Sequence, residues 1–385
     1  MKSLYKFDDI FEVDKVFNCF GISLIQNIRN KHGKVFLFVS IVELSLMLIS
    51  LSIDFVQNLT SKQLIYSIVQ FCMMEVAAHA LITAYILFYK HLPELSDIVL
   101  TLKEDFPQDL KTQKKHNIHR KLRVINWFVN ICMIIYFSCI DFFDISPLFW
   151  RIYDSFMLQE VRLKLPFEMY CPFNVENMFV YILMYLLLVW ASYTIVIVML
   201  CYDFSFVSVL TCLCIQVEIL CDKIQNINPQ DKNSKEDLKS CIEMHKKLIV
   251  IVEKTDEVFS FVMLHNILAS TGVICVSSFL VVHGVEISLI WTFMEMLLTG
   301  LIQISLHCYY GEKLLGSSIK IAESLYSHHW YVGDEEYKKL VLVMMVQSQR
   351  PQKINAFGFF DVNFETLSDI LAKSYSYFSL LKSLY

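Results

Sequence analysis

Long apolar stretches recur along the chain, and the segments between them carry most of the charged residues. Six of these stretches are long enough for the roughly 20 residues that a helix needs to cross a bilayer. They cover residues 35–56, 64–89, 124–143, 179–200, 258–282 and 287–310, and a seventh, more polar stretch covers 362–384. The pattern predicts an all-α membrane protein with seven transmembrane helices and no separately folding domain.

The composition supports a membrane protein and excludes several other classes. Hydrophobic residues make up 56% of the 385 residues and charged residues only 18%, which leaves too little polar surface for a soluble protein of this length. No P-loop, dinucleotide-binding glycine pattern or zinc-finger spacing occurs, and neither GxSxG nor HExxH is present. We therefore expect neither an enzyme nor a nucleic-acid binder, and we expect no cofactor and no metal.

The distribution of basic residues predicts the orientation in the membrane. Lysine and arginine side chains resist translocation and therefore collect on the cytoplasmic side. The successive segments outside the predicted spans carry six, one, eight, three, seven, none and six of them. This alternation places the N-terminus in the cytoplasm and the C-terminus outside the cell. It also places the sequon at Asn58 outside, where this asparagine is a candidate for glycosylation.

The fourth apolar stretch continues well beyond the membrane. From residue 179 the helical pattern runs without a clear breaker to Pro229, about twice the length that a span requires. We expect this helix to project into the cytoplasm to about residue 226. Helical patterns also begin near residue 238 and follow the sixth span, and the apolar run 340–346 is too short to cross a membrane. These segments predict a packed helical anchor in the cytoplasm.

Aromatic and small residues gather in one half of the second, third and fourth spans. An apolar pocket with a few hydroxyl groups suits a small, poorly water-soluble ligand. The candidate ligand-binding residues are Ala77, Ala80, Tyr136, Phe137, Cys139, Ile140, Phe143, Tyr181, Met184 and Tyr185. Any one of them could equally serve helix packing or lie at the membrane interface.

Four ionisable residues stand out within the predicted spans: Glu43, Glu75, His79 and Glu295. Glu75 and His79 are four residues apart on one helical face, so each could be the partner of the other. Ionisable groups inside a membrane indicate functional sites. A hydrogen-bonded pair that joins neighbouring helices explains them equally well.

The last helix separates into two faces at 100° per residue. One face carries Asp369, Lys373, Ser376, Leu380, Ser383 and Leu384, and the opposite face carries Phe364, Leu367, Leu371 and Phe378. Lipid would penalise the polar face, so it must turn toward protein or water. One copy of this helix cannot enclose a channel, but four copies around a symmetry axis could.

The C-terminal third resembles the insect odorant receptors. The resemblance is carried by YYGEKLLGSSIKIAESLYSHHWY and by QSQRPQKINAFGFFDVNFETLSDILAKSYSYFSLLK. LPFEMYCPF before the fourth span, Gln216 and His245 agree with it. The loop between the fourth and fifth spans lacks the long insertion of the shared co-receptor of that family. The chain is therefore similar to a ligand-tuned subunit of the family.

The resemblance implies a fold and an assembly. It implies the insect olfactory receptor channel fold, in a heterotetramer with the shared co-receptor in the plasma membrane of a sensory neuron dendrite. By the same resemblance, the anchor and subunit interface include Tyr310, Gly311, Glu312, Trp330 and Tyr331, and the pore and gate include Ser376, Leu380, Ser383 and Leu384. The expected organisation is 1–34 as a cytoplasmic segment, 35–310 as six helices with the ligand pocket, 311–360 as the cytoplasmic anchor and 361–385 as the pore-lining seventh helix. Lys382 and Ser383 depart from a uniformly apolar gate.

These expectations lead to one main functional hypothesis and two alternatives. The main hypothesis is an odorant-specific subunit of an odorant-gated, non-selective cation channel that binds a small volatile ligand and contacts membrane lipid and permeating cations. The first alternative is a metabotropic seven-helix receptor coupled to a G protein, although no DRY or NPxxY sequence follows the third span or lies in the seventh. The second is a transporter with Glu75, His79 and Glu295 as a proton relay, although the paired broken helices of that class are missing.

Overall fold

Helices account for nearly all of the described chain. The computed structural model describes residues 6–7, 10, 22–23, 28–29, 31–59, 64–157, 165–166, 169–173, 177–282 and 287–384. The long helices are α2 (Lys31–Leu59), α3 (Leu64–Thr83), α6 (Ile118–Met157), α7 (Met178–Asn226), α8 (Ser234–Val282), α9 (Ile287–Ser327) and α11 (Phe364–Leu384). The short helices are η2 (Ala84–Lys90), α4 (Leu92–Glu104), α5 (Leu110–Lys115), η3 (Trp330–Val332) and α10 (Glu335–Ser348). Two antiparallel strand pairs, β1 (Ile22–Ser23) with β2 (Ile28–Arg29) and β3 (Asn355–Ala356) with β4 (Phe360–Asp361), complete the elements.

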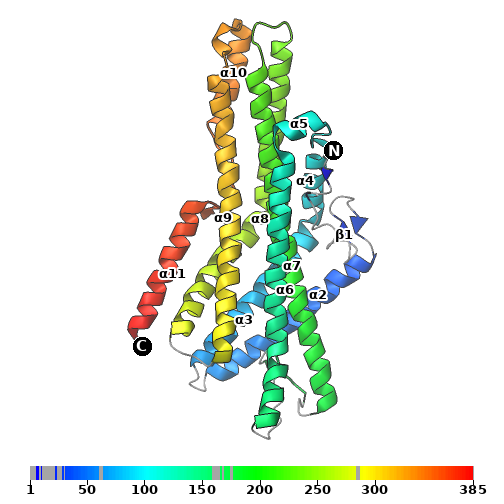
Figure 1. The fold of residues 1–385 in the computed structure, drawn as a ribbon, viewed down its shortest axis with the longest axis vertical. Coiled ribbons are helices and arrows are strands. Elements are labelled where there is room, and N and C mark those ends of the chain that lie inside the picture. The colour runs from blue at the N-terminus through cyan, green and yellow to red at the C-terminus, as the bar shows by residue number, and fades with distance from the viewer. Residues whose placement is uncertain are drawn as a thin grey trace.

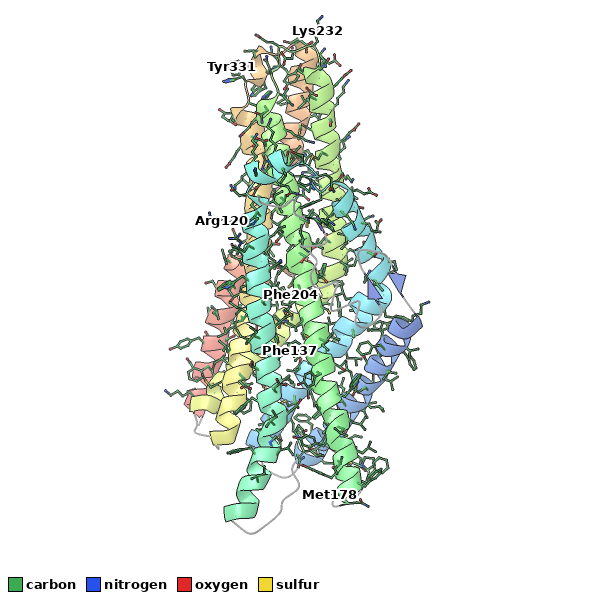
Figure 2. All side chains as sticks on the ribbon, turned by 45° about the vertical axis from the view of Figure 1, so that its right-hand side comes forward. Arg120, Phe137, Met178, Phe204, Lys232 and Tyr331 are labelled. Atoms are coloured by element: carbon green, nitrogen blue, oxygen red, sulfur yellow. The ribbon has the colours of Figure 1, made fainter. Side chains whose placement is uncertain are left out.

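Three helices, α7, α8 and α9, extend along the long axis of the molecule (Figure 1). At one end they form a narrow bundle with α10, and toward the other end α2, α3 and α6 surround them. The red helix α11 lies beside α8 and α9 and leads to the C-terminus. Figure 2 places Lys232 and Tyr331 at the narrow end and Met178 at the opposite end.

The length of α7 follows from its sequence. No glycine or proline occurs between Met178 and Asn226, and the Asn177 side chain caps the first turn by accepting a hydrogen bond from the Phe179 backbone at 3.0 Å. At about 1.5 Å per residue the helix is roughly two and a half times as long as the hydrocarbon core is thick. The predicted extension to about residue 226 agrees with the end of this helix.

Five of the described helices are long and apolar enough to cross a membrane: Gly33–Asn58, Val69–Leu87, Ile118–Phe149, Met178–Asn226 and Ser234–Leu280. They correspond to the first five predicted spans. The sixth predicted span lies in α9 and the seventh in α11. The polar and charged residues of α11, among them Asp369, Lys373 and Lys382, explain why it is less apolar than the others.

The third helix is longer than the sequence pattern indicated. The third predicted span ends at residue 143, yet α6 continues to Met157 with Pro147 inside it. Proline has no backbone N–H to donate to the carbonyl four residues earlier, which here belongs to Phe143. The Ser146 hydroxyl donates to that carbonyl at 3.3 Å, so the oxygen keeps a partner and the helix continues.

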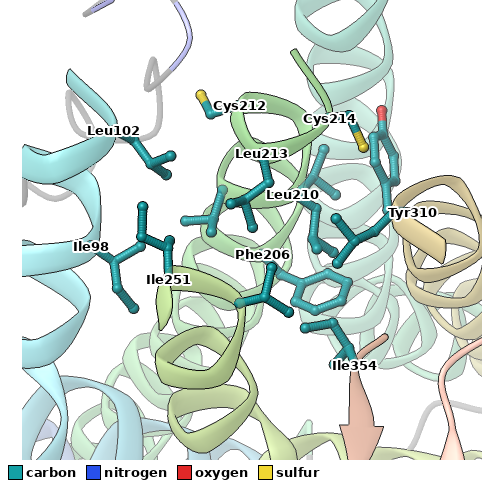
Figure 3. Close-up of a cluster of buried hydrophobic side chains, with 14 of the residues drawn as sticks. Ile98, Leu102, Phe206, Leu210, Cys212, Leu213, Cys214, Ile251, Tyr310 and Ile354 are labelled. Atoms are coloured by element: carbon teal, nitrogen blue, oxygen red, sulfur yellow. The ribbon is translucent and has the colours of Figure 1, made fainter. Parts of the chain in front are cut away.

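The main apolar core lies where α4 meets the long helices. Figure 3 shows Ile98 and Leu102 of α4 near Ile251 of α8, with Leu210 and Leu213 of α7 between them and Tyr310 of α9. The sequence pattern did not predict α4, which buries Leu92, Leu95, Ser96, Ile98, Val99 and Leu102. This helix packs against α7 and α8.

The narrow end is a packed helical bundle that is held together in part by ion pairs. Lys235 at the start of α8 forms ion pairs with Asp334 at 2.6 Å and Glu336 at 2.7 Å. These carboxylates raise the pKa of the Lys235 amine and this lysine lowers the pKa of both acids. Tyr337 is fully buried and hydrogen-bonded to His328 at 2.5 Å.

Candidate functional site

A cavity of about 210 Å³ lies between six helices. Its lining residues are Met47 from α2, Met73, Glu75, Val76 and His79 from α3, Tyr136, Cys139, Ile140 and Phe143 from α6, Ile195, Val196 and Met199 from α7, Asn266, Ala269, Ser270 and Val273 from α8, and Glu295, Met296, Thr299, Gly300 and Gln303 from α9. Most of the wall is apolar, and a smaller group of polar side chains projects from α3, α6, α8 and α9. This mixture is typical of sites for small organic ligands.

Helical periodicity explains the wall that α9 contributes. Glu295, Thr299 and Gln303 are four residues apart and therefore share one face. Gly300 lies on the same face, and a Cβ placed on it would meet no other atom within 4 Å. The glycine therefore contributes open volume to the cavity.

A buried polar network supports the floor of the cavity. Asp203 of α7 is only 1% exposed and accepts a hydrogen bond from Gln303 at 3.0 Å and from the Tyr136 hydroxyl at 3.3 Å. Nε2 of His307 lies 3.1 Å from the Asp203 carboxylate, and Nδ1 of His307 lies 3.1 Å from the Asn266 amide. A buried carboxylate is costly without partners, so this network holds α6, α7, α8 and α9 in one arrangement around the cavity.

A histidine pair joins α3 to α8 at the cavity wall. Nδ1 of His79 and Nδ1 of His265 are 2.9 Å apart, and the two rings stack with an interplanar angle of 12°. The Glu75 carboxylate lies 3.9 Å from Nε2 of His265. Glu75 and His79 were predicted as possible direct partners. In the structure His265 lies between them and contacts both.

Four of the predicted ligand-binding residues, Tyr136, Cys139, Ile140 and Phe143, line the cavity. The other six do not line it. Ala77 and Ala80 are fully buried where α3 packs on α2 and α7, and the Phe137 ring packs on Tyr193. Tyr181 packs on Tyr185, whose hydroxyl donates to the Asp144 carbonyl. Met184 is half-buried outside the cavity. The cluster lay in suitable helices, but its members on α3 and α7 face neighbouring helices.

The sequence interpretation missed the walls from α8 and α9. Two signals in the sequence could have indicated these walls. One is the polar stripe at a spacing of four residues on α9, formed by Glu295, Thr299 and Gln303. The other is the set of residues three or four apart on α8 that includes Asn266, Ala269, Ser270 and Val273. Small and polar residues at helical spacing within an apolar helix indicate a face that is turned away from lipid.

The seventh helix presents one polar face away from the rest of the chain. Ser376, Leu380 and Ser383 are exposed, and the two serine hydroxyls donate to carbonyls of their own helix, those of Ala372 and Leu380. Leu384 is the last residue of α11, and its side chain lies outside the described residues.

The face of α11 that packs on the bundle differs in part from the face that the helical wheel predicted. Thr366, Ile370 and Ser374 are buried against the bundle, whereas Phe364 and Leu371 are 48% and 43% exposed. The difference arises because a helical wheel locates a face only to within a turn. The small Ser374 side chain allows α11 to approach α8 closely, and its hydroxyl lies 3.4 Å from the Thr271 carbonyl.

The predicted anchor residues fall into two groups. Tyr310, Gly311 and Glu312 lie where the start of α11 meets α9: Tyr310 is buried, and the Glu312 carboxylate accepts a hydrogen bond from the Phe364 backbone at 3.3 Å. A Cβ on Gly311 would overlap the carbonyl oxygen of Val362. Trp330 and Tyr331 form η3 at the narrow end, where Trp330 is half-buried and Tyr331 is exposed.

The glycosylation candidate lies in a helix. Asn58 belongs to the last turn of α2, and its amide donates to the backbone carbonyl and the carboxylate of Asp54, both at 3.0 Å. Attachment of a glycan would require the amide to leave these acceptors.

Three comparisons place the chain among known proteins. A family model described as 7tm Odorant receptor matches residues 65–375. Odorant receptor 85b of Drosophila melanogaster is 23% identical over 296 residues, which span 76% of each protein, and odorant receptor 67c of the same species is 27% identical over 273 residues, which span 68% of this chain and 65% of the relative. The solved structure of the insect olfactory receptor OR5 from Machilis hrabei in complex with eugenol matches with a TM-score of 0.84 at 15% identity, covering 98% of each chain.

Proposed function

The chain belongs to the odorant receptor family of seven-transmembrane proteins, and on that premise we propose that it is an odorant-specific subunit of an odorant-gated, non-selective cation channel. The chain is a multi-pass membrane receptor and not an enzyme. Its all-α membrane fold, predicted from the sequence, is confirmed by the match to the insect olfactory receptor structure. The metabotropic alternative has no support from these relatives.

The observation that carries the proposal is the cavity between the six helices. Its volume of about 210 Å³ and its largely apolar lining suit a small volatile molecule. Tyr136, Cys139, Ile140 and Phe143 then serve as contacts for the ligand. A ligand that binds the open arrangement of these helices better than the closed one shifts the channel toward opening.

The function is tested by recording currents from cells that express the chain with the shared co-receptor of the family. We expect a panel of small volatile compounds to include at least one that evokes current only when this chain is present. Cells that express the co-receptor alone provide the control. Surface-expressed chain that responds to no member of a broad panel would count against the proposal.

We propose that the chain contacts that co-receptor, in a heterotetramer, through the narrow end of the helical bundle. Apolar side chains are exposed there on one part of α10, where Leu342 is 61% and Val343 is 65% exposed. Large exposed apolar patches indicate contact with another protein, and this patch lies far from the predicted spans. We place the assembled channel in the plasma membrane of the sensory dendrite, with the N-terminus in the cytoplasm and the C-terminus outside.

We predict that Leu342→Glu combined with Val343→Glu reduces assembly with the co-receptor at least tenfold, because two charges would be buried in the interface without partners. Co-purification of the tagged co-receptor measures the effect. Gln347→Glu is the matched control, since Gln347 is exposed on the same helix and is already polar. Unchanged co-purification of the double variant would place the interface elsewhere.

We propose that Ser376, Leu380, Ser383 and Leu384 line the outer part of the pore, with the two leucines as a hydrophobic gate that conducts when wetted. Leu384→Ser is expected to raise the basal current without odorant several-fold, because a hydroxyl eases wetting of the constriction. Leu371→Ser, on another side of the same helix, is the control and should leave basal current unchanged. Equal basal currents for wild type and Leu384→Ser would contradict a gate at this position.

A further inference from the structure

His79 lines the cavity and carries a buried hydrogen-bonding nitrogen that has no partner within the described part of the chain. Its side chain is 6% exposed and lines the cavity wall. Nδ1 of His79 contacts His265, whereas Nε2 is buried and has no hydrogen-bond partner within the described part of the chain. A buried polar atom without a partner costs free energy that a ligand can recover.

Other polar side chains of the cavity have partners within the protein. The Tyr136 hydroxyl and the Gln303 amide both donate to Asp203, the Ser270 hydroxyl donates to Asn266, and the Thr299 hydroxyl donates to the Glu295 carbonyl. These donors are therefore already engaged before a ligand arrives. Among the described residues that line the cavity, His79 is the one with a buried side-chain nitrogen or oxygen that has no hydrogen-bond partner.

The neighbours of His79 determine which of its nitrogens carries the proton. The Glu75 carboxylate lies 3.9 Å from Nε2 of His265, which favours the His265 tautomer with its proton on that nitrogen. Nδ1 of His265 is then an acceptor, so Nδ1 of His79 must donate across the 2.9 Å contact. We therefore assign the His79 proton to Nδ1, and Nε2 is left as a hydrogen-bond acceptor.

We propose, on the premise of the function proposed above, that Nε2 of His79 accepts a hydrogen bond from the ligand. The receptor is then selective for small apolar molecules with one O–H or N–H donor, such as alcohols, phenols and amines, over ethers and esters of the same size. The apolar wall from α2, α6 and α7 accommodates the hydrocarbon part. Glu75 and His265 act as positioning residues that keep the His79 proton on Nδ1.

The test uses isomeric probes on the chain co-expressed with the co-receptor. 2-Phenylethanol carries a donor, and its isomer benzyl methyl ether carries only an acceptor; linear primary alcohols and their isomeric methyl ethers extend the comparison. We expect the alcohols to activate at concentrations about tenfold lower than the ethers, the factor that one additional hydrogen bond supplies. Wild-type responses that are equal for both isomers throughout the panel would overturn the proposal.

Three variants of His79 identify which of its nitrogens binds the ligand. His79→Phe removes both nitrogens, His79→Asn keeps an amide near the position of Nδ1, and His79→Gln restores an acceptor near the position of Nε2. We expect His79→Phe and His79→Asn to weaken the response to alcohols about tenfold and to leave ethers unchanged, and His79→Gln to restore much of the alcohol response. Equal loss for alcohols and ethers in His79→Phe would show a packing role and overturn the proposal.

Binding measured on the purified complex separates this inference from the function on which it rests. Thermal stabilisation by 2-phenylethanol that His79→Phe abolishes, without any evoked current, would support the inference and contradict the channel function. Evoked currents that do not distinguish the two isomers would support the channel function and contradict the inference. Absence of both binding and current for all alcohols would overturn the inference directly.

Discussion

Gly311→Ala is expected to abolish the odorant-evoked current of the assembled channel. The added Cβ would overlap the backbone carbonyl oxygen of Val362, and a backbone atom cannot move aside as a flexible side chain can. Val362 leads directly into α11, whose first turn is also held by the Glu312 carboxylate. The substitution therefore displaces the start of the proposed pore helix, and overpacking of this kind costs about 1–3 kcal/mol.

The matched control for this prediction is Gly316→Ala, one and a half turns further along α9. A Cβ at Gly316 meets no other atom within 4 Å, and alanine is the better helix former by about 1 kcal/mol. The thermal midpoint of purified protein should therefore fall for Gly311→Ala and remain equal or rise for Gly316→Ala. Normal currents and an unchanged midpoint for Gly311→Ala would show that α11 does not dock through this contact.

Gly300→Phe is expected to eliminate the response to every odorant that acts through the cavity. The glycine lines the cavity, and the space beside it is open. A cavity of about 150 Å³ is sufficient for benzene, so a phenyl ring would occupy most of the 210 Å³ present here. No volume would remain for a ligand of ordinary odorant size, and saturating concentrations should not restore the current.

A graded series separates filling of the cavity from misfolding. Gly300→Ala adds one methyl group and should change the effective concentration only a few-fold, with a larger effect on large ligands than on small ones. Surface labelling should show wild-type levels for both variants. A full response of Gly300→Phe, at normal surface level, would place odorant binding outside this cavity.

Much of the helical architecture could be predicted from the sequence, since a span needs only a long apolar stretch. The absence of glycine and proline before Pro229 predicted the extent of α7, which ends at Asn226. The predicted third span ended at residue 143, where the apolar stretch ends, whereas α6 continues to Met157. The Ser146 hydroxyl that satisfies the Phe143 carbonyl in the longer helix depends on three-dimensional geometry. The amphipathic helix α4 was missed because it is shorter than a span and lies in a segment rich in charge.

The cavity was predictable only in part. Periodicity shows which residues share a face, but it does not show which neighbour that face meets. Ala77 and Ala80, for example, meet neighbouring helices and not the cavity: their small side chains let α3 approach α2 and α7. Asp203 escaped notice because its three partners, Tyr136, Gln303 and His307, come from helices that are distant in sequence.

The central claim is that odorant binding opens a channel formed by the protein itself. Current recorded from excised membrane patches that contain this chain and the co-receptor, in solutions without nucleotides, tests it most directly. The account predicts a rapid, reversible cation current when odorant is applied, with no current when Gly300→Phe replaces the wild-type chain. A response that disappears on excision and returns only when GTP is supplied would contradict it and favour signalling through a G protein.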